Sequence, residues 1–367
     1  MKKILIIAGD NSGDLHGANL MKELFEKHPE IEFVGIGGDL MKKNGLISLV
    51  ELKDISVVGF WEVAKKVLFF KSLLKKIKSI LENEAIDLFI AIDFPGFNER
   101  VAEFAKKIHK PVIWYIAPQL WAWGEKRSVK FSQLIDLLLV VFPFEVDYFR
   151  KFGINCHFVG HPLLDIPEYS NTILKFDERE NKILLMPGSR LQELRKHLPL
   201  LNEVAKKIKN RFNDYKIVIA VPEYFQKEIK EMVNDKSIKI STEARKELLT
   251  SKVGIIKTGT SNLEAALAGL PFVMYYKTSS LTYFLGKKLI NLEYLSLVNI
   301  LAKKNVVKEL IQSDATPNKI VDEIVKLLEN RKYYLNQVQE FDLIKNYLGK
   351  PGTARNCANI IYENYLK

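Results

Sequence analysis

Two short segments in the second half of the chain place glycine beside hydroxyl or basic side chains, directly after an apolar run. The first is Pro187-Gly188-Ser189-Arg190 after Ile183–Met186, and the second is Thr258-Gly259-Thr260-Ser261 after Val253–Ile256. Glycine lets the backbone approach a ligand, a helix N-terminus attracts anions, and Arg190 can pair with phosphate through several N–H donors. Two such turns in one domain suit a diphosphate, although a plain helix start would use similar residues.

Glu264 stands about one helical turn beyond the second of these segments. At that distance its carboxylate could accept hydrogen bonds from ribose hydroxyls. A capping-box partner for Thr260 or Ser261 is the alternative role for the same residue. The second half therefore predicts a nucleoside diphosphate site.

In the first half, the candidate for acid–base chemistry is Asp93, which follows the apolar run Leu88–Ile92. Ligands of open parallel sheets bind beyond the carboxyl ends of the strands, where a carboxylate could accept a proton from a hydroxyl nucleophile. Capping of a helix that begins near Phe97 is the alternative role.

The first apolar run ends in the segment Gly9–Gly17, which fits neither a dinucleotide-binding loop nor a Walker loop because its glycine spacing differs and no lysine follows. Ser12, Gly13 and Asp14 could contact a ligand here. Ser12 or Asp14 could instead cap the following helix, and a simple strand-to-helix turn explains the segment equally well.

Residues 61–76 give a different signal. Phe69 and Phe70 are adjacent, so one helix face cannot bury both of them, and lysines flank the apolar residues. This combination is typical of a helix that lies in a membrane interface, whereas an ordinary crossover helix with long lysines is the alternative. The residues expected to contact a membrane are Trp61, Val67, Leu68, Phe69, Phe70 and Leu73.

The composition indicates a globular protein with a basic surface. A length of 367 residues exceeds what one hydrophobic core usually serves, so we expect two domains. The net charge of +11 would attract nucleic acid, anionic lipid or phosphorylated substrates, and a solvated basic surface would explain it as well. Nucleic acid is disfavoured, because no recognisable binding fold accompanies the charge.

No apolar stretch approaches the ~20 residues of a transmembrane helix, and residues 9–11 interrupt the apolar start before a signal-peptide core could form. Cys156 and Cys357 are too few for a disulfide framework or a zinc site. We therefore expect a cytoplasmic protein. No H-E-x-x-H, clustered Cys/His or D-x-D pattern occurs, so neither a catalytic metal nor a cofactor is implied.

These candidate residues require a scaffold of parallel strands and crossover helices. The strand-like runs are Lys3–Ala8, Glu32–Ile36, Leu88–Ile92, Val112–Ile116, Leu137–Phe142, Ile183–Met186, Ile217–Val221, Val253–Ile256 and Pro271–Tyr276. Their alternation with amphipathic stretches predicts an α/β fold of two tandem doubly wound, Rossmann-like domains with a cleft between them. We expect domains at 1–165 and 166–345, a linker at about 165–181, and a C-terminal helix within 346–367 that ties the halves together.

Ten segments occur in a fixed order along the chain. They are Gly9–Gly17, Gly35–Gly38, Ser56–Val63, Ile92–Pro95, Ala117–Trp123, Phe142–Glu145, Gly160–Pro162, Pro187–Arg190, Thr258–Glu264 and Asn299–Leu301. In this order they resemble the lipid-A-disaccharide synthases, inverting glycosyltransferases of the GT-B type. The resemblance implies that UDP-2,3-diacylglucosamine and 2,3-diacylglucosamine 1-phosphate are joined to a β-1,6-linked lipid A disaccharide 1-phosphate, with release of UDP.

The resemblance also implies roles for the candidate residues. Asp93 would be the base or polar orienter for the acceptor 6-hydroxyl, and Ser12, Gly13 and Asp14 would line the acceptor side. The donor contacts would be Gly188, Ser189, Arg190, Thr258, Gly259, Thr260 and Ser261 for the diphosphate, and Glu264 and Asn299 for the nucleoside, assisted by Glu309. The other expected partners are the inner-membrane surface and, as an open possibility, further copies of the chain.

This chain departs from the family pattern at two places near the acceptor side. The family usually has Gly-Glu-Ala-Ser where this chain has Gly9-Asp10-Asn11-Ser12, and it usually has an aspartate at the position of Gly96. The alternatives are a UDP-N-acetylglucosamine 2-epimerase-like enzyme, which would not need the apolar, basic helix, and a non-catalytic lipid- or nucleotide-binding scaffold.

Overall fold

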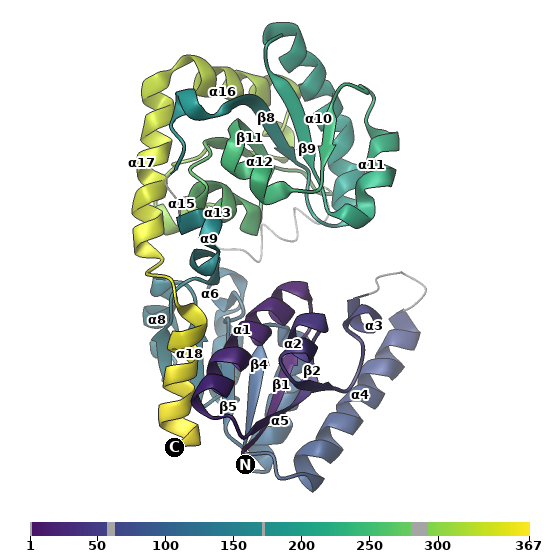
Figure 1. Cartoon of the computed structure of the whole chain (residues 1–367), viewed down its shortest axis with the longest axis vertical. Coiled ribbons are helices and arrows are strands. Elements are labelled where there is room, and N and C mark those ends of the chain that lie inside the picture. Colours follow the sequence, from purple (N-terminus) through teal and green to yellow (C-terminus); the bar gives the residue numbers. More distant parts are fainter. Residues whose placement is uncertain (1, 57–62, 171–172, 280–292) are drawn as a thin grey trace. The chain divides into compact units, whose positions relative to one another are not determined.

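Strands and helices alternate along both halves of the chain (Figure 1), and the structure, a computed structural model, describes residues 2–56, 63–170, 173–279 and 293–367. The chain forms two compact units. One consists of residues 1–165 and 348–367, and the other of residues 166–347.

The first unit is built on a seven-stranded parallel sheet with the order β3-β2-β1-β4-β5-β6-β7. Its strands are β1 (Lys2–Ala8), β2 (Ile31–Ile36), β3 (Leu46–Ser48), β4 (Leu88–Ile92), β5 (Val112–Tyr115), β6 (Leu137–Val140) and β7 (Cys156–Phe158). Ala8 pairs with Ile92 at the ends of β1 and β4, so Gly9 and Asp93 leave the sheet side by side.

The helices of this unit connect and cover the strands (Figure 1). They are α1 (Asn11–Lys27), α2 (Asp39–Lys43), α3 (Leu52–Ser56), α4 (Val63–Asn83), α5 (Pro95–Lys107), α6 (Leu120–Trp123), α7 (Glu125–Ser132), α8 (Pro143–Arg150), the 3₁₀ turn Pro162–Asp165, and α18 (Thr353–Ile361) with a π-helical turn at Tyr362–Leu366. α18 packs against α1, so the end of the chain belongs to the first unit.

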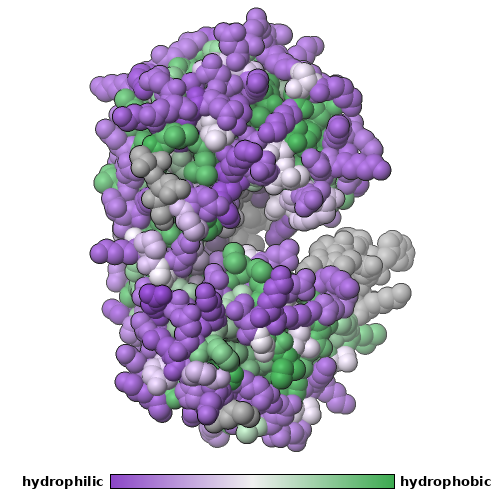
Figure 2. Space-filling model, viewed as in Figure 1, coloured by the Kyte–Doolittle hydropathy of each residue, from purple (hydrophilic) through white to green (hydrophobic). Residues whose placement is uncertain are grey.

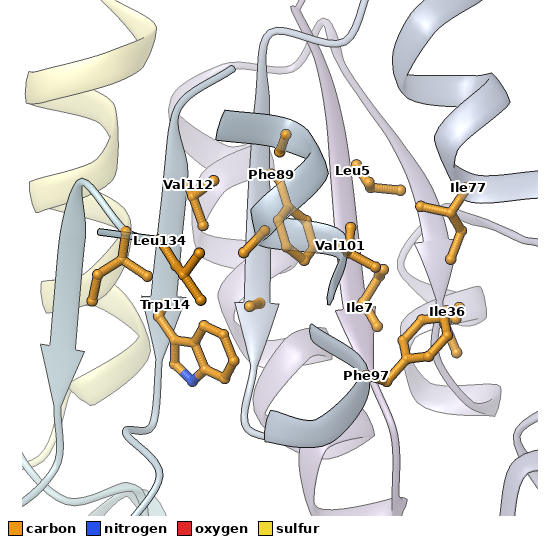
Figure 3. Close-up of a cluster of buried hydrophobic side chains, with 14 of the residues drawn as sticks. Leu5, Ile7, Ile36, Ile77, Phe89, Phe97, Val101, Val112, Trp114 and Leu134 are labelled. Carbon is orange, nitrogen blue, oxygen red and sulfur yellow. The ribbon is translucent and has the colours of Figure 1, made fainter. Parts of the chain in front are cut away.

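The core of the first unit lies between its sheet and the helices on one face (Figure 3). Phe89 and Trp114 on the central strands are fully buried, together with Ile77 of α4 and Val101 of α5. Burying side chains of this size stabilises the fold by about 2 to 3 kcal/mol each. The loops at the carboxyl ends of β1 and β4 are thus anchored on a rigid support.

The second unit is built on a six-stranded parallel sheet with the order β10-β9-β8-β11-β12-β13. Its strands are β8 (Glu180–Met186), β9 (Lys216–Ala220), β10 (Lys239–Ser241), β11 (Ser251–Lys257), β12 (Phe272–Tyr276) and β13 (Glu309–Ile311). Met186 pairs with Ile256, so the segments after β8 and β11 leave neighbouring strands at the same edge.

The helices of the second unit include two long ones, α10 and α17, at its surface (Figure 1). The helices are α9 (Pro167–Ser170), α10 (Leu191–Arg211), α11 (Gln226–Met232), α12 (Ala244–Thr250), α13 (Thr260–Leu267), α15 (Leu297–Ala302), α16 (Pro317–Glu329) and α17 (Arg331–Tyr347), with 3₁₀ turns at Phe176–Glu178, Glu223–Phe225 and Gln312–Asp314. Ile183 and Ile255 of the sheet pack with Leu194 and Leu201 of α10 and Ile324 of α16 in one buried cluster.

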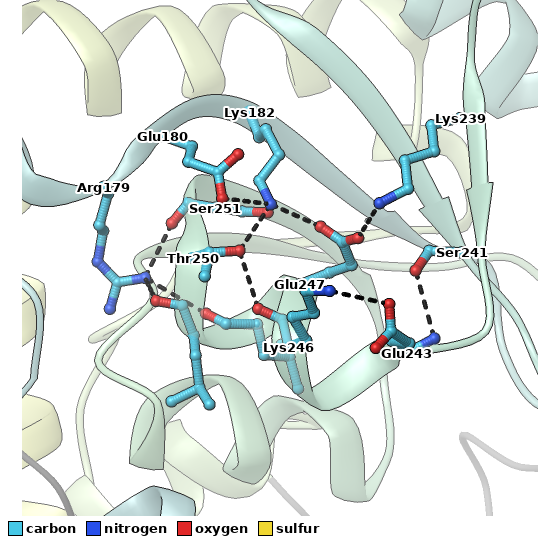
Figure 4. A network of polar contacts seen from close by, with 12 residues as sticks. Arg179, Glu180, Lys182, Lys239, Ser241, Glu243, Lys246, Glu247, Thr250 and Ser251 are labelled. Carbon is cyan, nitrogen blue, oxygen red and sulfur yellow. Dashed lines mark hydrogen bonds and ion pairs between the residues drawn. The ribbon is translucent and has the colours of Figure 1, made fainter.

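A buried polar network around Arg179, Lys182 and Glu247 supports the second sheet from its amino end (Figure 4). The guanidinium of Arg179 donates to carbonyl oxygens at the C-terminal ends of α12 and α13, including those of Leu248 at 3.3 Å and Ala268 at 2.6 Å. Lys182 and Lys239 both donate to the fully buried carboxylate of Glu247, each at 2.7 Å. A cation at helix C-termini complements their dipoles, so Arg179 fixes the far ends of α12 and α13.

The predicted α/β fold with two parallel sheets is confirmed. All nine expected strands are present, with ends within three residues of the prediction, but the three-residue edge strands β3, β7, β10 and β13 were not foreseen. The stretch 165–181 is not a plain linker, because it contains α9 and a 3₁₀ turn and because β8 already begins at Glu180. The helix expected near Phe97 begins at Pro95.

The surface in Figure 2 is mostly hydrophilic, with hydrophobic side chains scattered between the polar ones. Within the described ranges, no helix combines the length and the apolar character that crossing a bilayer requires.

Candidate functional site

The main candidate site is a cavity of about 400 Å³ in the second unit, at the carboxyl ends of β8 and β11. Eight of the ten predicted donor-binding residues line it, and these are Gly188, Ser189, Arg190, Thr258, Gly259, Thr260, Ser261 and Glu264. They come from two segments about 70 residues apart in sequence, which the pairing of β8 with β11 brings together. Ligand sites of parallel sheets occur at this place.

Two glycines allow both segments to turn from strand into helix. Gly188 has φ = 123° and Gly259 has φ = 145°, values that side chains with a Cβ atom rarely adopt. Arg190 is the N-cap residue of α10, and Gly259 is the N-cap residue of α13. The N-terminal backbone N–H groups of both helices therefore begin at the cavity, where they favour an anion.

The charges in the cavity are balanced by a carboxylate. Glu193 accepts a hydrogen bond from Lys257 Nζ at 3.0 Å and one from the backbone N–H of Ser189 at 3.3 Å. A Cβ atom at Gly188 would approach its Oε2 atom to 2.4 Å, so the carboxylate lies directly against the glycine turn. Glu193 thus accepts from two hydrogen-bond donors that could also bind a phosphate, and Arg190 is exposed.

His197 supports the glycine turn from behind. Its side chain is 1% exposed, and its Nδ1 and Nε2 atoms lie 2.7 Å and 2.9 Å from the carbonyl oxygens of Pro187 and Lys277. A carbonyl oxygen only accepts, so both hydrogen bonds form together when both ring nitrogens carry a proton. His197 thus joins the glycine turn after β8 to the segment after β12, a link that no local sequence pattern indicated.

Glu264 enters the cavity from α13. Its Oε1 atom accepts a hydrogen bond from the hydroxyl of Tyr169 at 3.2 Å, and it lines the cavity together with Thr260 and Ser261. Burial raises the pKa of the Glu264 carboxyl, while the hydrogen bond from Tyr169 and the charge of Arg245 act in the opposite direction.

Asn299 and Glu309 do not line this cavity. Asn299 is fully buried, and its amide uses all four of its hydrogen-bonding positions, with Glu309, Val306 and both backbone groups of Val307. Glu309 also accepts the backbone N–H of Leu295, whose carbonyl oxygen accepts from Thr258 Oγ1 at 3.1 Å. The geometry therefore gives the pair a supporting role behind Thr258.

In the first unit, Asp93 lies in a strained turn directly after β4. Its φ is 44° and that of Phe94 is 53°, both in the left-handed region that side chains with a Cβ atom avoid. Asn98 holds the turn, because its Nδ2 donates to the carbonyl oxygen of Asp93 at 2.8 Å. The ring of Phe94 lies so close to Gly9 that a Cβ atom there would approach it to 2.3 Å.

Burial raises the pKa of Asp93 to about 6, with a further increase from the charge of Asp10 and an opposing hydrogen bond from the backbone of Phe94. A carboxyl with this pKa is mostly ionised at neutral pH and remains basic enough to accept a proton from a developing alkoxide. The alternative role of Asp93, capping of the following helix, is not seen, since the N-cap residue of α5 is Phe94.

The residues around Asp10 differ from the predicted capping scheme. The N-cap residue of α1 is Asp10, whose Oδ1 accepts from the backbone of Gly13 at 2.7 Å and from Ser12 Oγ at 2.8 Å. Asp14 is buried, and its carboxylate accepts backbone N–H groups from the first turn of α2, including Met41 at 3.0 Å. Ser12 remains exposed at the edge of the site, whereas Asp14 joins α1 to α2.

The first described turns of α4 divide the predicted membrane-contacting residues into two groups. Val67 and Leu68 are 47% and 68% exposed, whereas Phe69 and Phe70 pack against the core and Leu73 is buried within it. The helix therefore buries both phenylalanines at least in part, contrary to the expectation from their adjacency. Trp61 lies outside the described residues.

Within the part of the chain that the structure describes, no three His, Cys, Asp or Glu side chains gather in a group that could hold a metal ion.

Comparison with known proteins identifies the chain's relatives. The family model described as lipid-A-disaccharide synthetase matches residues 4–358. The lipid-A-disaccharide synthase of Persephonella marina is 34% identical over 380 aligned residues, which cover 99% of both chains. That of Trichlorobacter lovleyi is also 34% identical, covering 98% of this chain and 97% of the relative.

Solved structures with little sequence similarity share the fold. A UDP-GlcNAc 2-epimerase from Neisseria meningitidis bound to UDP-GlcNAc matches with a TM-score of 0.63 at 13% identity, covering 99% of both chains. The calicheamicin glycosyltransferase matches with a TM-score of 0.66 at 14% identity, covering 100% of both chains. The epimerase alternative is not favoured, because its likeness is one of fold alone. The sequence relatives over the whole length show that the chain belongs to the lipid-A-disaccharide synthase family, glycosyltransferases of lipid A biosynthesis.

Proposed function

We propose that this chain transfers diacylglucosamine from its UDP derivative to the 6-hydroxyl of diacylglucosamine 1-phosphate, forming the β-1,6-linked disaccharide 1-phosphate and UDP. The observation that carries the proposal is the cavity of the second unit, in which two glycine turns and two helix N-termini meet beside Arg190 and Glu264. In this proposal the unit of residues 166–347 takes the UDP-sugar donor, and the other unit takes the acceptor lipid.

The donor cavity suits a departing nucleoside diphosphate. Negative charge grows on the diphosphate as the bond from its oxygen to C1 of the sugar breaks. Arg190, Lys257 and the helix N-termini supply hydrogen-bond donors and positive charge in that place, and such groups stabilise developing charge when they are positioned beforehand. A phosphate that used Lys257 and the backbone N–H of Ser189 would take them from Glu193, whose carboxylate accepts hydrogen bonds from both.

Asp93 supplies the base on the acceptor side. The acceptor 6-hydroxyl loses its proton to the Asp93 carboxylate, and its oxygen attacks C1 of the donor on the face opposite the diphosphate, so the configuration at C1 inverts. The pKa of about 6 keeps the carboxylate ionised at neutral pH, and the rigid turn held by Asn98 fixes its direction. Ser12 and Gly13 lie beside Asp10 at the same edge of the sheet and would contact the acceptor.

We further propose that the chain works in the cytoplasm on the inner surface of the inner membrane, with α4 as its contact. Val67, Leu68, Lys71 and Lys75 are all exposed, and their spacing places them on one face of α4. Two apolar and two basic side chains on one face suit an anionic lipid interface. Both substrates carry acyl chains, so a membrane contact would bring the enzyme to them.

The test is to incubate the purified protein with the UDP-activated donor, with and without diacylglucosamine 1-phosphate, and to measure UDP and the lipid products. We expect UDP release that requires the acceptor, together with a disaccharide of the combined mass. UDP release without the acceptor, or none with both substrates, would contradict the proposal. A protein that only isomerised UDP-N-acetylglucosamine would instead support the epimerase alternative.

A further inference from the structure

Tyr169 is a buried tyrosine whose hydroxyl points at the candidate ribose-binding carboxylate. Its side chain is 1% exposed, and its hydroxyl donates to Glu264 Oε1 at 3.2 Å. Tyr169 itself is not among the residues that line the cavity, whereas Glu264 is. The tyrosine therefore acts on the cavity through the glutamate.

The position of Tyr169 is fixed at several points. Its carbonyl oxygen accepts from Lys345 Nζ at 2.5 Å, and the guanidinium of Arg245 lies 6.0 Å from the centre of its ring. Arg245 in turn donates to Glu168 at 3.1 Å. Tyr169 and Glu168 belong to α9, whereas Arg245 lies in α12 and Lys345 in α17, so the backbone and the ring of Tyr169 are held by elements distant in sequence.

A carboxylate that binds the two hydroxyls of a ribose must be ionised and must face them. Glu264 is a long side chain in a largely buried place, and burial acts against its ionisation. One hydrogen bond from a fixed donor to Oε1 favours the ionised form and selects one rotamer, which leaves Oε2 and the remaining lone pair of Oε1 for the ligand.

We propose that Tyr169 is a positioning residue for the donor, which orients the Glu264 carboxylate toward the ribose hydroxyls of the UDP group. This inference rests on the proposed function, because it takes Glu264 as the ribose contact. Tyr169 does not touch the donor, so its contribution depends on the presence of the ribose hydroxyls. That dependence distinguishes it from a residue that only stabilises the fold.

The experiment measures binding of UDP and of 2′,3′-dideoxy-UDP to the wild-type protein and to Tyr169→Phe by titration calorimetry. The substitution keeps the buried ring and removes only the hydroxyl. We expect UDP to bind the variant about tenfold more weakly, as for a lost hydrogen bond to a charged group. Dideoxy-UDP should bind both proteins with affinities that agree within about twofold, because it lacks the hydroxyls that Glu264 would hold.

Tyr334→Phe is the matched control. Tyr334 is also a buried tyrosine of the second unit, and its hydroxyl has no hydrogen-bond partner among the described residues. The Tyr334→Phe variant should bind both ligands as tightly as the wild-type protein does. If Tyr169→Phe weakened the binding of UDP and of dideoxy-UDP equally, or changed neither affinity, the positioning role would be wrong, but the proposed donor site would not be contradicted. If the wild-type protein did not bind UDP, the donor site and this inference would fall together.

Discussion

Replacing Asp93 by asparagine removes a charge that the fold holds largely out of water, and stability and activity should respond in opposite directions. Asparagine has nearly the same shape, and it tolerates the left-handed backbone that Asp93 adopts at φ = 44°. The substitution therefore tests the charge rather than the turn. Turnover should fall by about 10² to 10⁴, the usual contribution of a general base, while binding of UDP to the other unit should remain unchanged.

The stability effect can be calculated from the pKa. Folding raises the pKa of Asp93 from 3.8 to about 6, so the folded state binds the proton more tightly than the unfolded state does. The native carboxyl therefore favours folding below about pH 4, and this advantage is lost as the pH rises through about 6. At pH 8 the buried charge costs about 3 kcal/mol, the energy that corresponds to this difference in pKa. Asp93→Asn should raise the free energy of unfolding by up to that amount at pH 8 but by less than about 1 kcal/mol at pH 4.

The assay is urea unfolding of the wild-type protein and the variant at pH 4 and at pH 8. The result is the difference in the free energy of unfolding between the two proteins at each pH. A gain in the free energy of unfolding that is much larger at pH 8 than at pH 4, together with lost turnover, is the expected result. An equal difference at both pH values would mean that the turn, not the buried charge, determines the effect. Turnover that survived the substitution would refute Asp93 as the base.

Three further predictions follow from the same geometry. Asp10→Asn keeps an N-cap residue for α1 and removes a charge that raises the pKa of Asp93. The acid limb of the kcat/KM profile should therefore move to lower pH, and a limb that did not move would contradict the coupling between Asp10 and Asp93. A Cβ atom at Gly96 would meet no atom within 4 Å, and the residue lies in the first turn of α5. Gly96→Asp should therefore leave the melting temperature unchanged or raise it, and turnover should stay within about threefold of the wild-type value. A large gain in turnover would show that one carboxylate is insufficient. Val67→Ser combined with Leu68→Ser should weaken binding to anionic liposomes at least about tenfold with little change in melting temperature. Leu343→Ser, at a side chain that is 60% exposed, should leave liposome binding unchanged. Equal losses of liposome binding in the two variants would exclude α4 as the contact.

The sequence predicted the inner strands and the glycine turns because both are encoded locally. Inner strands of a parallel sheet are buried on both faces, so runs such as Leu88–Ile92 are continuously apolar. The four strands that were missed are the edge strands of the two sheets, each only three residues long. An edge strand needs less apolar surface, and natural sheets keep edges short, so Leu46–Ser48 or Lys239–Ser241 leaves no clear pattern.

Contacts between distant segments could not be predicted from one sequence. Local rules offered Ser12 or Asp14 as the cap of α1. Asp14 instead accepts hydrogen bonds from the backbone at the start of α2, some 25 residues further on, and Asp10 is the N-cap residue of α1. In the same way, nothing near Tyr169 indicates Glu264, and nothing near His197 indicates Lys277. The glycine turns could be found from their composition, whereas the side chains that hold them in place became evident only in the folded chain.

The candidate sites are also where the chain departs from what stability alone would favour. A glycine at position 93 or 94 would relieve the left-handed backbone, yet the chain has Asp93 and Phe94 there. Phe94 offsets part of this strain by packing on Phe97, with ring centres 5.6 Å apart, so the turn stays rigid while Asp93 keeps its carboxyl. In the second unit, Glu193 puts a negative charge into a cavity whose helix N-termini favour anions. In the proposed reaction, Asp93 would take a proton from the acceptor, and a phosphate of the donor would take the hydrogen-bond donors that Glu193 uses. Both departures would then serve transfer rather than folding.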